Sequence, residues 1–204
     1  MKRAIVCILL ILGASSAHAQ DTHRFSFFIC PGPSIPIAPQ DFSEFWSIGP
    51  GLSAGISYAI TPALAGMIML DGSLFTVRED KAAEALGINQ TSLDIAGGRI
   101  TMLSVTGNLK ACLTPHASRS GPYVYGGGGL YRLSVGGQGM VGGWSVYPLA
   151  WPEDESALGA QFGAGTEIVA TASINILIEG RYLIGFTKDE SRQTIQLRLG
   201  ISTR

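Results

Sequence analysis

The chain has 204 residues, and only 14% of them are charged, well below the roughly 25% of an ordinary soluble domain. Its 14 basic and 15 acidic residues nearly balance, and no basic cluster stands out, so no nucleic-acid partner is expected. Glycine is abundant, at 27 residues, but lacks the period of collagen, and the length fits one domain.

Residues 1–19 have the pattern of a cleaved export signal. Lys2 and Arg3 precede a short apolar run over residues 4–12, and Ala17-His18-Ala19 is a small-x-small cleavage site. Removal of residues 1–19 takes away Lys2 and Arg3 and leaves 12 basic residues against 15 acidic ones, a net charge of −3 for the domain 20–204. No later stretch approaches the roughly 20 apolar residues of a transmembrane helix, so membrane residence would require strands.

The rest of the chain alternates between apolar and polar residues with period 2, which indicates extended strands. The clearest example is 172–186, where Ile174, Ile176 and Ile178 alternate with Asn175 and Glu179. The pattern predicts eight strands, at residues 23–30, 45–60, 63–77, 99–113, 122–135, 157–170, 172–186 and 192–202.

The connections between these strands alternate in length. A Pro-rich loop at 31–44 and long segments at 78–98 and 136–156 are predicted at one end, with a short helix inside 78–98. The connection at 187–191, at the same end, is of intermediate length. The three connections at the other end are short, which is the arrangement of outer-membrane barrels with external loops and periplasmic turns. The predicted fold is therefore an all-β, eight-stranded, antiparallel up-and-down transmembrane barrel.

Alternation alone does not say which face of the strands is wet. A soluble, lipocalin-like barrel with an apolar interior is the alternative. The polar face is rich in glycine, which weakens solvated strands but fits a narrow lumen, and its charges can neutralise one another. The predicted lumenal charge network, which is structural, comprises Asp71, Lys110, Arg132, Glu167, Glu179, Arg181 and Arg198. Aromatic residues near strand ends predict interfacial girdles on the apolar face: Trp46, Tyr58, Tyr123, Tyr125 and Phe186.

Residues 51–74, 122–135 and 157–202 resemble the small outer-membrane barrel superfamily that includes the OmpA transmembrane domain and opacity-type proteins. The segment Ile178-Glu179-Gly180-Arg181-Tyr182 is similar to the penultimate strand common in these barrels. The resemblance implies an integral protein of the outer membrane of a Gram-negative-type cell.

No catalytic, cofactor or metal site is expected. The two histidines of the mature chain, His23 and His116, have no nucleophile or carboxylate at a telling spacing. The runs of glycine do not open a helix, so they do not form a nucleotide loop. Cys30 falls near the outer end of the predicted barrel and Cys112 near its inner end, too far apart for a disulfide.

The expected function is a non-enzymatic structural, adhesion or surface-interaction role, carried out by a monomer. Its expected partners are outer-membrane lipid and a surface ligand bound through residues 78–98 and 136–156. A soluble periplasmic carrier of small ligands is the first alternative, and a lipid-modifying barrel enzyme is the second.

Overall fold

The computed structural model describes residues 25–86, 93–114, 121–141, 145–146, 154–188 and 190–203. The predicted signal segment lies outside them. Two short helices join a set of long strands. The strands are β1 (Phe25–Ala38), β2 (Gly49–Ala59), β3 (Leu64–Thr76), β4 (Leu93–Cys112), β5 (Gly121–Val141), β6 (Ser145–Val146), β7 (Glu155–Val169), β8 (Ile174–Phe186) and β9 (Ser191–Thr203), and the helices are α2 (Gln40–Phe45) and α3 (Glu79–Leu86).

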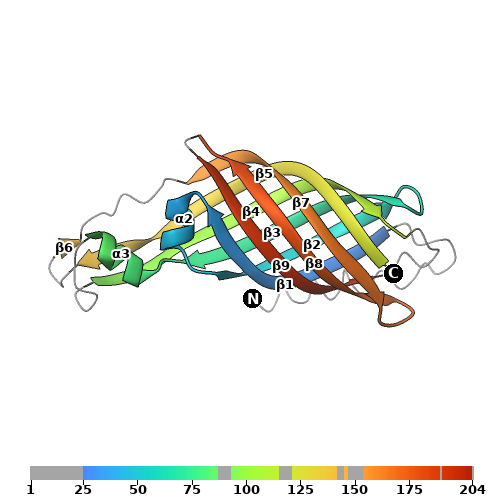
Figure 1. Cartoon of the computed structure of the whole chain (residues 1–204), viewed down its shortest axis with the longest axis horizontal. Coiled ribbons are helices and arrows are strands. Elements are labelled where there is room, and N and C mark those ends of the chain that lie inside the picture. Colours follow the sequence, from blue (N-terminus) through green and yellow to red (C-terminus); the bar gives the residue numbers. More distant parts are fainter. Residues whose placement is uncertain are drawn as a thin grey trace, which may run out of the picture.

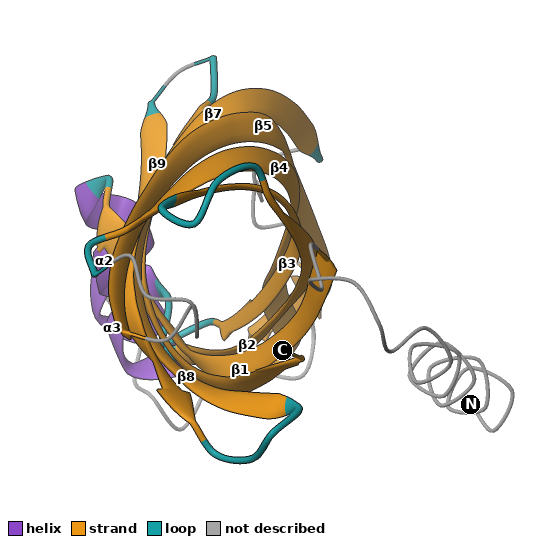
Figure 2. Cartoon of the chain, turned by 90° about the vertical axis from the view of Figure 1, so that its right-hand side faces the viewer, coloured by secondary structure: helices purple, strands orange, loops and turns teal. Residues whose placement is uncertain are grey.

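The eight long strands close into a barrel (Figure 2). Each strand pairs antiparallel with its neighbours in sequence, and β1 pairs with β9 to close the ring. The two-residue strand β6 pairs with residues 140–141, at the loop end of β5, whereas residues 121–133 of β5 pair with β7. This confirms the predicted eight-stranded up-and-down barrel.

The two ends of the barrel differ (Figure 1). At one end, which we call the turn end, β2 and β3 are joined by a tight turn in which Ile60 N–H donates to Leu64 O at 2.9 Å. A similar turn joins β7 to β8, and β1 begins where β9 finishes, with Phe27 N–H donating to Thr203 Oγ1 at 2.9 Å. The other end, the loop end, carries both helices and the extended tip of the β4–β5 hairpin.

The first strand is longer than predicted. Residues 31–38 belong to β1, whereas the sequence placed a loop over 31–44, and residues 40–45 form α2. Proline has no N–H for a strand ladder, which is why the segment looked like a loop. The β1–β9 register accordingly lacks partners for residues 30–33, although β2 still pairs with all of them.

The two long loop-end segments are also shorter than predicted, because strands extend into them. Residues 93–96 of β4 pair with residues 138–141 of β5, beyond a register shift between Ala96 and Arg99. The short helix expected inside 78–98 is confirmed as α3. Strand β2 begins at Gly49 rather than at residue 45.

The outer face of the barrel is apolar. Ile68, Leu130 and Leu158 are 64%, 64% and 67% exposed, and similar side chains ring the barrel at the outward positions of every long strand. A belt of this kind is stable against hydrocarbon and costly against water, so the barrel is built to span a membrane. Among the described residues, no helix is long and apolar enough to cross a bilayer.

Glycine on β7 makes room for tyrosine on β5. A Cβ atom added at Gly159 would overlap the ring of Tyr131, and one at Gly163 would overlap the ring of Tyr125. Tyr123 faces Gly165 across the same pair of strands. Small inward residues therefore accommodate the large ones, as a narrow eight-stranded lumen requires.

Two of the five predicted girdle residues face outward, and three do not. Tyr58 and Phe186 lie on the exposed surface, whereas Trp46, Tyr123 and Tyr125 are buried. The prediction failed for β5 because both of its faces carry apolar residues, so periodicity could not distinguish inside from outside.

Candidate functional site

The centre of the lumen holds a buried ion network built around Arg181 of β8. Its guanidinium bridges the carboxylates of Asp71 on β3 and Glu179 on its own strand, and Nε donates to Glu179 Oε1 at 2.9 Å. The Arg181 side chain is fully buried and that of Asp71 is 3% exposed. An isolated charge could not be kept here, but a bridged pair with further hydrogen bonds can.

Two tyrosine hydroxyls complete the shell of Glu179. Tyr123 Oη donates to Glu179 Oε2 and Tyr125 Oη donates to Glu179 Oε1, both at 2.9 Å. The inward turn of these two side chains therefore has an electrostatic reason, because a buried carboxylate needs several donors. The sequence carried one missed signal, since both tyrosines share the parity of the inward glycines Gly127 and Gly129.

Arg198 of β9 binds the Pro-rich part of β1. Its Nη1 donates to the carbonyls of Gly32 at 2.7 Å and Pro33 at 3.0 Å, and its Nη2 donates to Ser34 Oγ at 3.0 Å. These carbonyls lie where the β1–β9 register has no partners. The side chain thus replaces missing ladder bonds, and it joins the central network through Ser53 at 3.2 Å.

A second ion pair closes the lumen near the turn end. Lys110 of β4 pairs with Glu167 of β7, and both side chains are about one-tenth exposed. The Lys110 ammonium also lies 4.1 Å from the centre of the Tyr123 ring. Asn175 Nδ2 approaches the other carboxylate oxygen of Glu167 at 3.4 Å.

One predicted member of the network is wrong. Arg132 points out of the barrel, where its side chain is 66% exposed and lies 3.6 Å from Asp154. The inward positions on either side of it are taken by Tyr131 and Leu133. The other six residues face the lumen and give three positive and three negative charges, so the interior is balanced.

The loop end of the lumen is closed by apolar side chains. Phe42 of α2 is 1% exposed and meets the fully buried Phe75 with ring centres 5.4 Å apart. Trp46, Ile100 and Leu183 belong to the same buried cluster. The sequence assigned this segment to a surface loop, whereas the structure buries Phe42 in this cluster, which we call the Phe42 plug.

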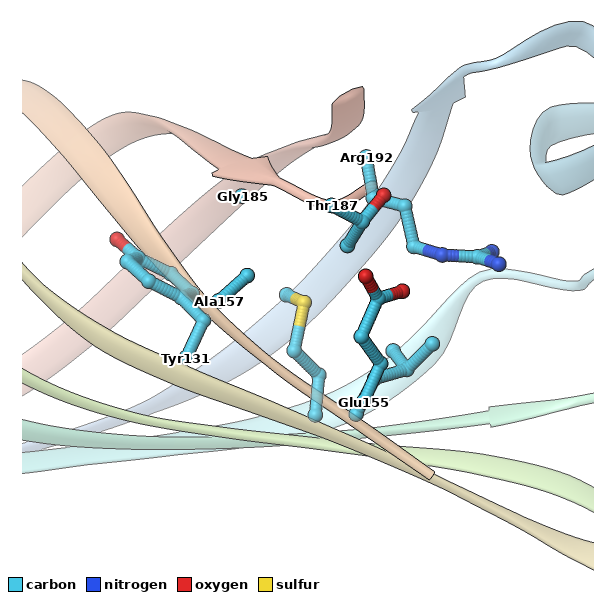
Figure 3. A pocket seen from close by; sticks show the side chains of 8 residues that line it. Tyr131, Glu155, Ala157, Gly185, Thr187 and Arg192 are labelled. Carbon is cyan, nitrogen blue, oxygen red and sulfur yellow. The ribbon is translucent and has the colours of Figure 1, made fainter. Parts of the chain in front are cut away.

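A small cavity of about 10 Å³ borders this plug (Figure 3). Tyr131, Glu155 and Arg192 line it from β5, β7 and β9. The guanidinium of Arg192 lies 5.5 Å from the centre of the Phe42 ring. The cavity has room for about one water molecule.

The cysteines, which are the described residues most suited to nucleophilic chemistry, lie apart from each other. Cys30 is buried in the lumen, Cys112 is partly exposed near the turn end, and both are free thiols, as predicted. Cys30 sits in the middle of β1 rather than at its outer end. His23 and His116 lie outside the described residues. Within those residues, no group of three acidic, histidine or cysteine side chains could hold a metal ion.

An apolar exterior and a charge-balanced, side-chain-filled lumen define the class of this protein as a transmembrane β-barrel with eight strands. A scan against models of protein families finds no match, and a search of curated proteins finds no sequence relative. The class is therefore established by structure rather than by sequence similarity.

Solved structures share this fold. Ail, the attachment invasion locus protein of Yersinia pestis, matches with a TM-score of 0.53 and 13% identity over 88% of this chain and 96% of its own. Neisserial surface protein A matches with a TM-score of 0.55 and 12% identity over 90% and 99%. Ail has also been solved in complex with the heparin analogue sucrose octasulfate, a structure that matches with a TM-score of 0.51 and 14% identity over 88% and 96%. The resemblance to small outer-membrane barrels is confirmed for the fold.

Proposed function

We propose that this protein is a non-conducting, non-enzymatic barrel of the outer membrane that presents its loop end to a surface partner. The observation that carries the proposal is the filled lumen. Ion pairs close it at the centre and near the turn end, and the Phe42 plug closes it at the loop end. A pore needs a continuous water-filled path, and none of these layers provides one.

The loop end is the part available for contact. Helix α3 and the tip of the β4–β5 hairpin stand beyond the barrel (Figure 1). Both belong to the segments 78–98 and 136–156, through which a surface ligand was predicted to bind. A rigid barrel that carries variable connections is a common scaffold for binding.

The charge of the loop end favours some partners over others. Residues 39–48, 77–98, 136–156 and 187–191 together contain 11 acidic residues and only 3 basic ones. The structural neighbour Ail is known in complex with a sulfated heparin analogue. A net charge of 3 − 11 = −8 would repel such a polyanion, so we expect a neutral or cationic partner.

The two other functions have less support. A soluble carrier would need a large apolar cavity, and three cavities lined by described lumenal residues measure about 10, 30 and 10 Å³, which is too small for such a ligand. A lipid-modifying enzyme would need a nucleophile and a base brought together at the loop-end rim. The absence of catalysis remains our proposal.

Four measurements and one set of substitutions test this function. The purified protein should require detergent for extraction, should show a gel mobility that changes on boiling, and should give no conductance steps in a planar bilayer. Cells that display it should bind poly-lysine beads more strongly than heparin beads. Neutralising α3 with Glu79→Gln, Asp80→Asn and Glu84→Gln should weaken that preference. Stable conductance or a preference for heparin would contradict the proposal.

A further inference from the structure

The charged residues that face away from the lumen form an unusual set. Among strand residues with described side chains, only Arg99 of β4 and Arg132 of β5 are charged and point outward. Both are basic, they lie on neighbouring strands, and both are at the loop end. The remaining described strand charges face the lumen.

Arg132 lies at the loop-end border of the apolar belt, and Arg99 lies beyond that border toward the loop end. Arg132 pairs across the strands with Leu103, and the next outward residue toward the turn end is Leu130. Arg99 lies four residues beyond Leu103 toward the loop end, about 14 Å along a strand. Basic side chains at this depth can reach the headgroup layer while their stems stay in the apolar layer.

A hollow lies next to Arg99 on the same outward surface, on the side of the turn end. It has a volume of about 330 Å³ and runs across β2, β3 and β4. Gly72 lines it between Leu52 and Leu74, and a Cβ atom added at Gly72 would lie 3.4 Å from Leu103 Cδ2. Thr101, the next outward residue after Arg99, lines the hollow at its edge nearest the loop end.

The charge around the hollow selects its occupant. Arg99 is exposed on the outward face of β4, and the ion pairs of the described residues do not include it. Arg132 keeps only a long, exposed contact with Asp154, at 3.6 Å, which is a weak interaction. Guanidinium groups bind phosphate oxygens with geometry that ammonium groups cannot reproduce.

We infer that this surface binds one anionic, phosphate-bearing membrane lipid, with an acyl chain in the hollow and its phosphate at Arg99. Arg132 provides a second basic contact for the headgroup. The inference rests on the proposed membrane placement and adds a specific lipid site to it. It assigns the site to the headgroup layer on the outward face of β4, where Arg99 pairs with Thr76, the last residue of β3 before α3.

The test is a comparison of lipid retention by native mass spectrometry. The full protein, refolded in detergent, is titrated with phosphatidylglycerol and with phosphatidylcholine that has identical acyl chains. The wild type should retain one phosphatidylglycerol at least fivefold more strongly than phosphatidylcholine. Arg99→Gln should reduce that retention about fivefold, the effect expected for one basic contact near a membrane surface, and Arg132→Gln should reduce it less.

Two matched controls separate the parts of the site. Lys188→Gln removes a basic, exposed side chain of the β8–β9 connection, three strands from β4, and should retain lipid like the wild type. Gly72→Leu fills the hollow without a charge change and should weaken retention. Gly107→Leu, at an outward glycine with open space around it, should not.

Each contrary outcome removes a stated part of the inference. Equal retention of the two lipids, or equal behaviour of Arg99→Gln and Lys188→Gln, would overturn the headgroup site. Unchanged retention in Gly72→Leu would overturn the acyl-chain site. Because every variant is first checked for the folded gel mobility, loss of lipid preference would leave the scaffold function standing, whereas loss of the barrel itself would contradict both proposals.

Discussion

Arg181 and Asp71 are 110 residues apart in the chain, yet their side chains meet in the middle of the lumen with almost no exposure to solvent. The pair joins β8 to β3 across the barrel rather than along the sheet. It therefore ties together strands that share no ladder hydrogen bonds, and it blocks the lumen at the same point.

We expect Arg181→Met to destabilise the barrel by about 3–5 kcal/mol, because it leaves the Asp71 and Glu179 carboxylates buried without their cation. Urea unfolding in lipid vesicles measures the change. The matched control is Arg132→Gln, which breaks an exposed pair and should cost about 0–1 kcal/mol. Similar unfolding midpoints for the two variants would show that the central network contributes little.

We expect Gly163→Val to destabilise the barrel by about 1–3 kcal/mol, since the new side chain would overlap the ring of Tyr125. Gly107→Val is the control, because an added Cβ there meets nothing within 4 Å. Both replace a strand glycine by a good β-former. If both variants were stabilised alike, the packing of Tyr125 over Gly163 would not require glycine at position 163.

Removing the plug should affect stability but not conductance. Phe42→Ala loses the contact with Phe75 and should cost about 3 kcal/mol, the lower end for truncating a buried phenylalanine. Planar-bilayer recordings should stay silent, because the ion pairs still fill the lumen below. Conductance steps in this single variant would mean that the plug alone keeps the barrel closed.

The two faces of β8 should differ in their access to lipid. Ile176 faces outward at 38% exposure, and Asn175 faces the lumen at 2%. A fluorophore attached at Ile176→Cys should be quenched by brominated lipid, and one at Asn175→Cys should not. The reverse result, or aqueous labelling of Ile176→Cys in the membrane, would invert the orientation of the strand.

The pKa of Asp154 should lie below the usual value of about 3.9. The Ser134 hydroxyl contacts both carboxylate oxygens at 2.9 and 3.0 Å, Val135 N–H donates at 3.1 Å, and Arg132 adds a positive charge; together they favour the ionised form. A lowered pKa adds stability above the unfolded pKa, and that stability is lost as the pH falls through the folded pKa.

An NMR titration of the Asp154 carboxyl carbon measures this shift. Its midpoint should lie below that of the same residue in the urea-unfolded chain. Ser134→Ala should raise it, because the largest single cause of the lowering is removed. A midpoint equal to that of the unfolded chain would show that these contacts do not persist in solution.

Periodicity was sufficient where only one face of a strand is apolar. Ile174, Ile176 and Ile178 fall on one face, and Asn175 and Glu179 fall on the other. Glycine and balanced charge on the polar face then predicted that the apolar face points outward, and the structure confirms it. On β5 the same reasoning failed, since Tyr123 and Tyr125 look apolar but donate hydrogen bonds to a buried carboxylate. Their orientation depends on Glu179, which lies on another strand.

Composition also could not separate a lumenal charge from a surface one. Arg181 and Arg132 occupy similar strand positions in the sequence, yet one is fully buried and the other is 66% exposed. A strand position becomes inward only through its register with both neighbours, and register shifts of one residue reverse it. The plug residue Phe42 is a further case, because its place depends on how a six-residue helix folds back.

The sequence by itself determined the class of structure: eight strands, an outward apolar face, a lumen of glycine and balanced charge, and connections that alternate in length. These properties follow from local period and composition, which water and lipid select directly. The tertiary structure alone decided which charges meet, where the lumen is closed and which arginines face the membrane. Those depend on contacts between residues as far apart as Asp71 and Arg181, which only closure of the barrel brings together.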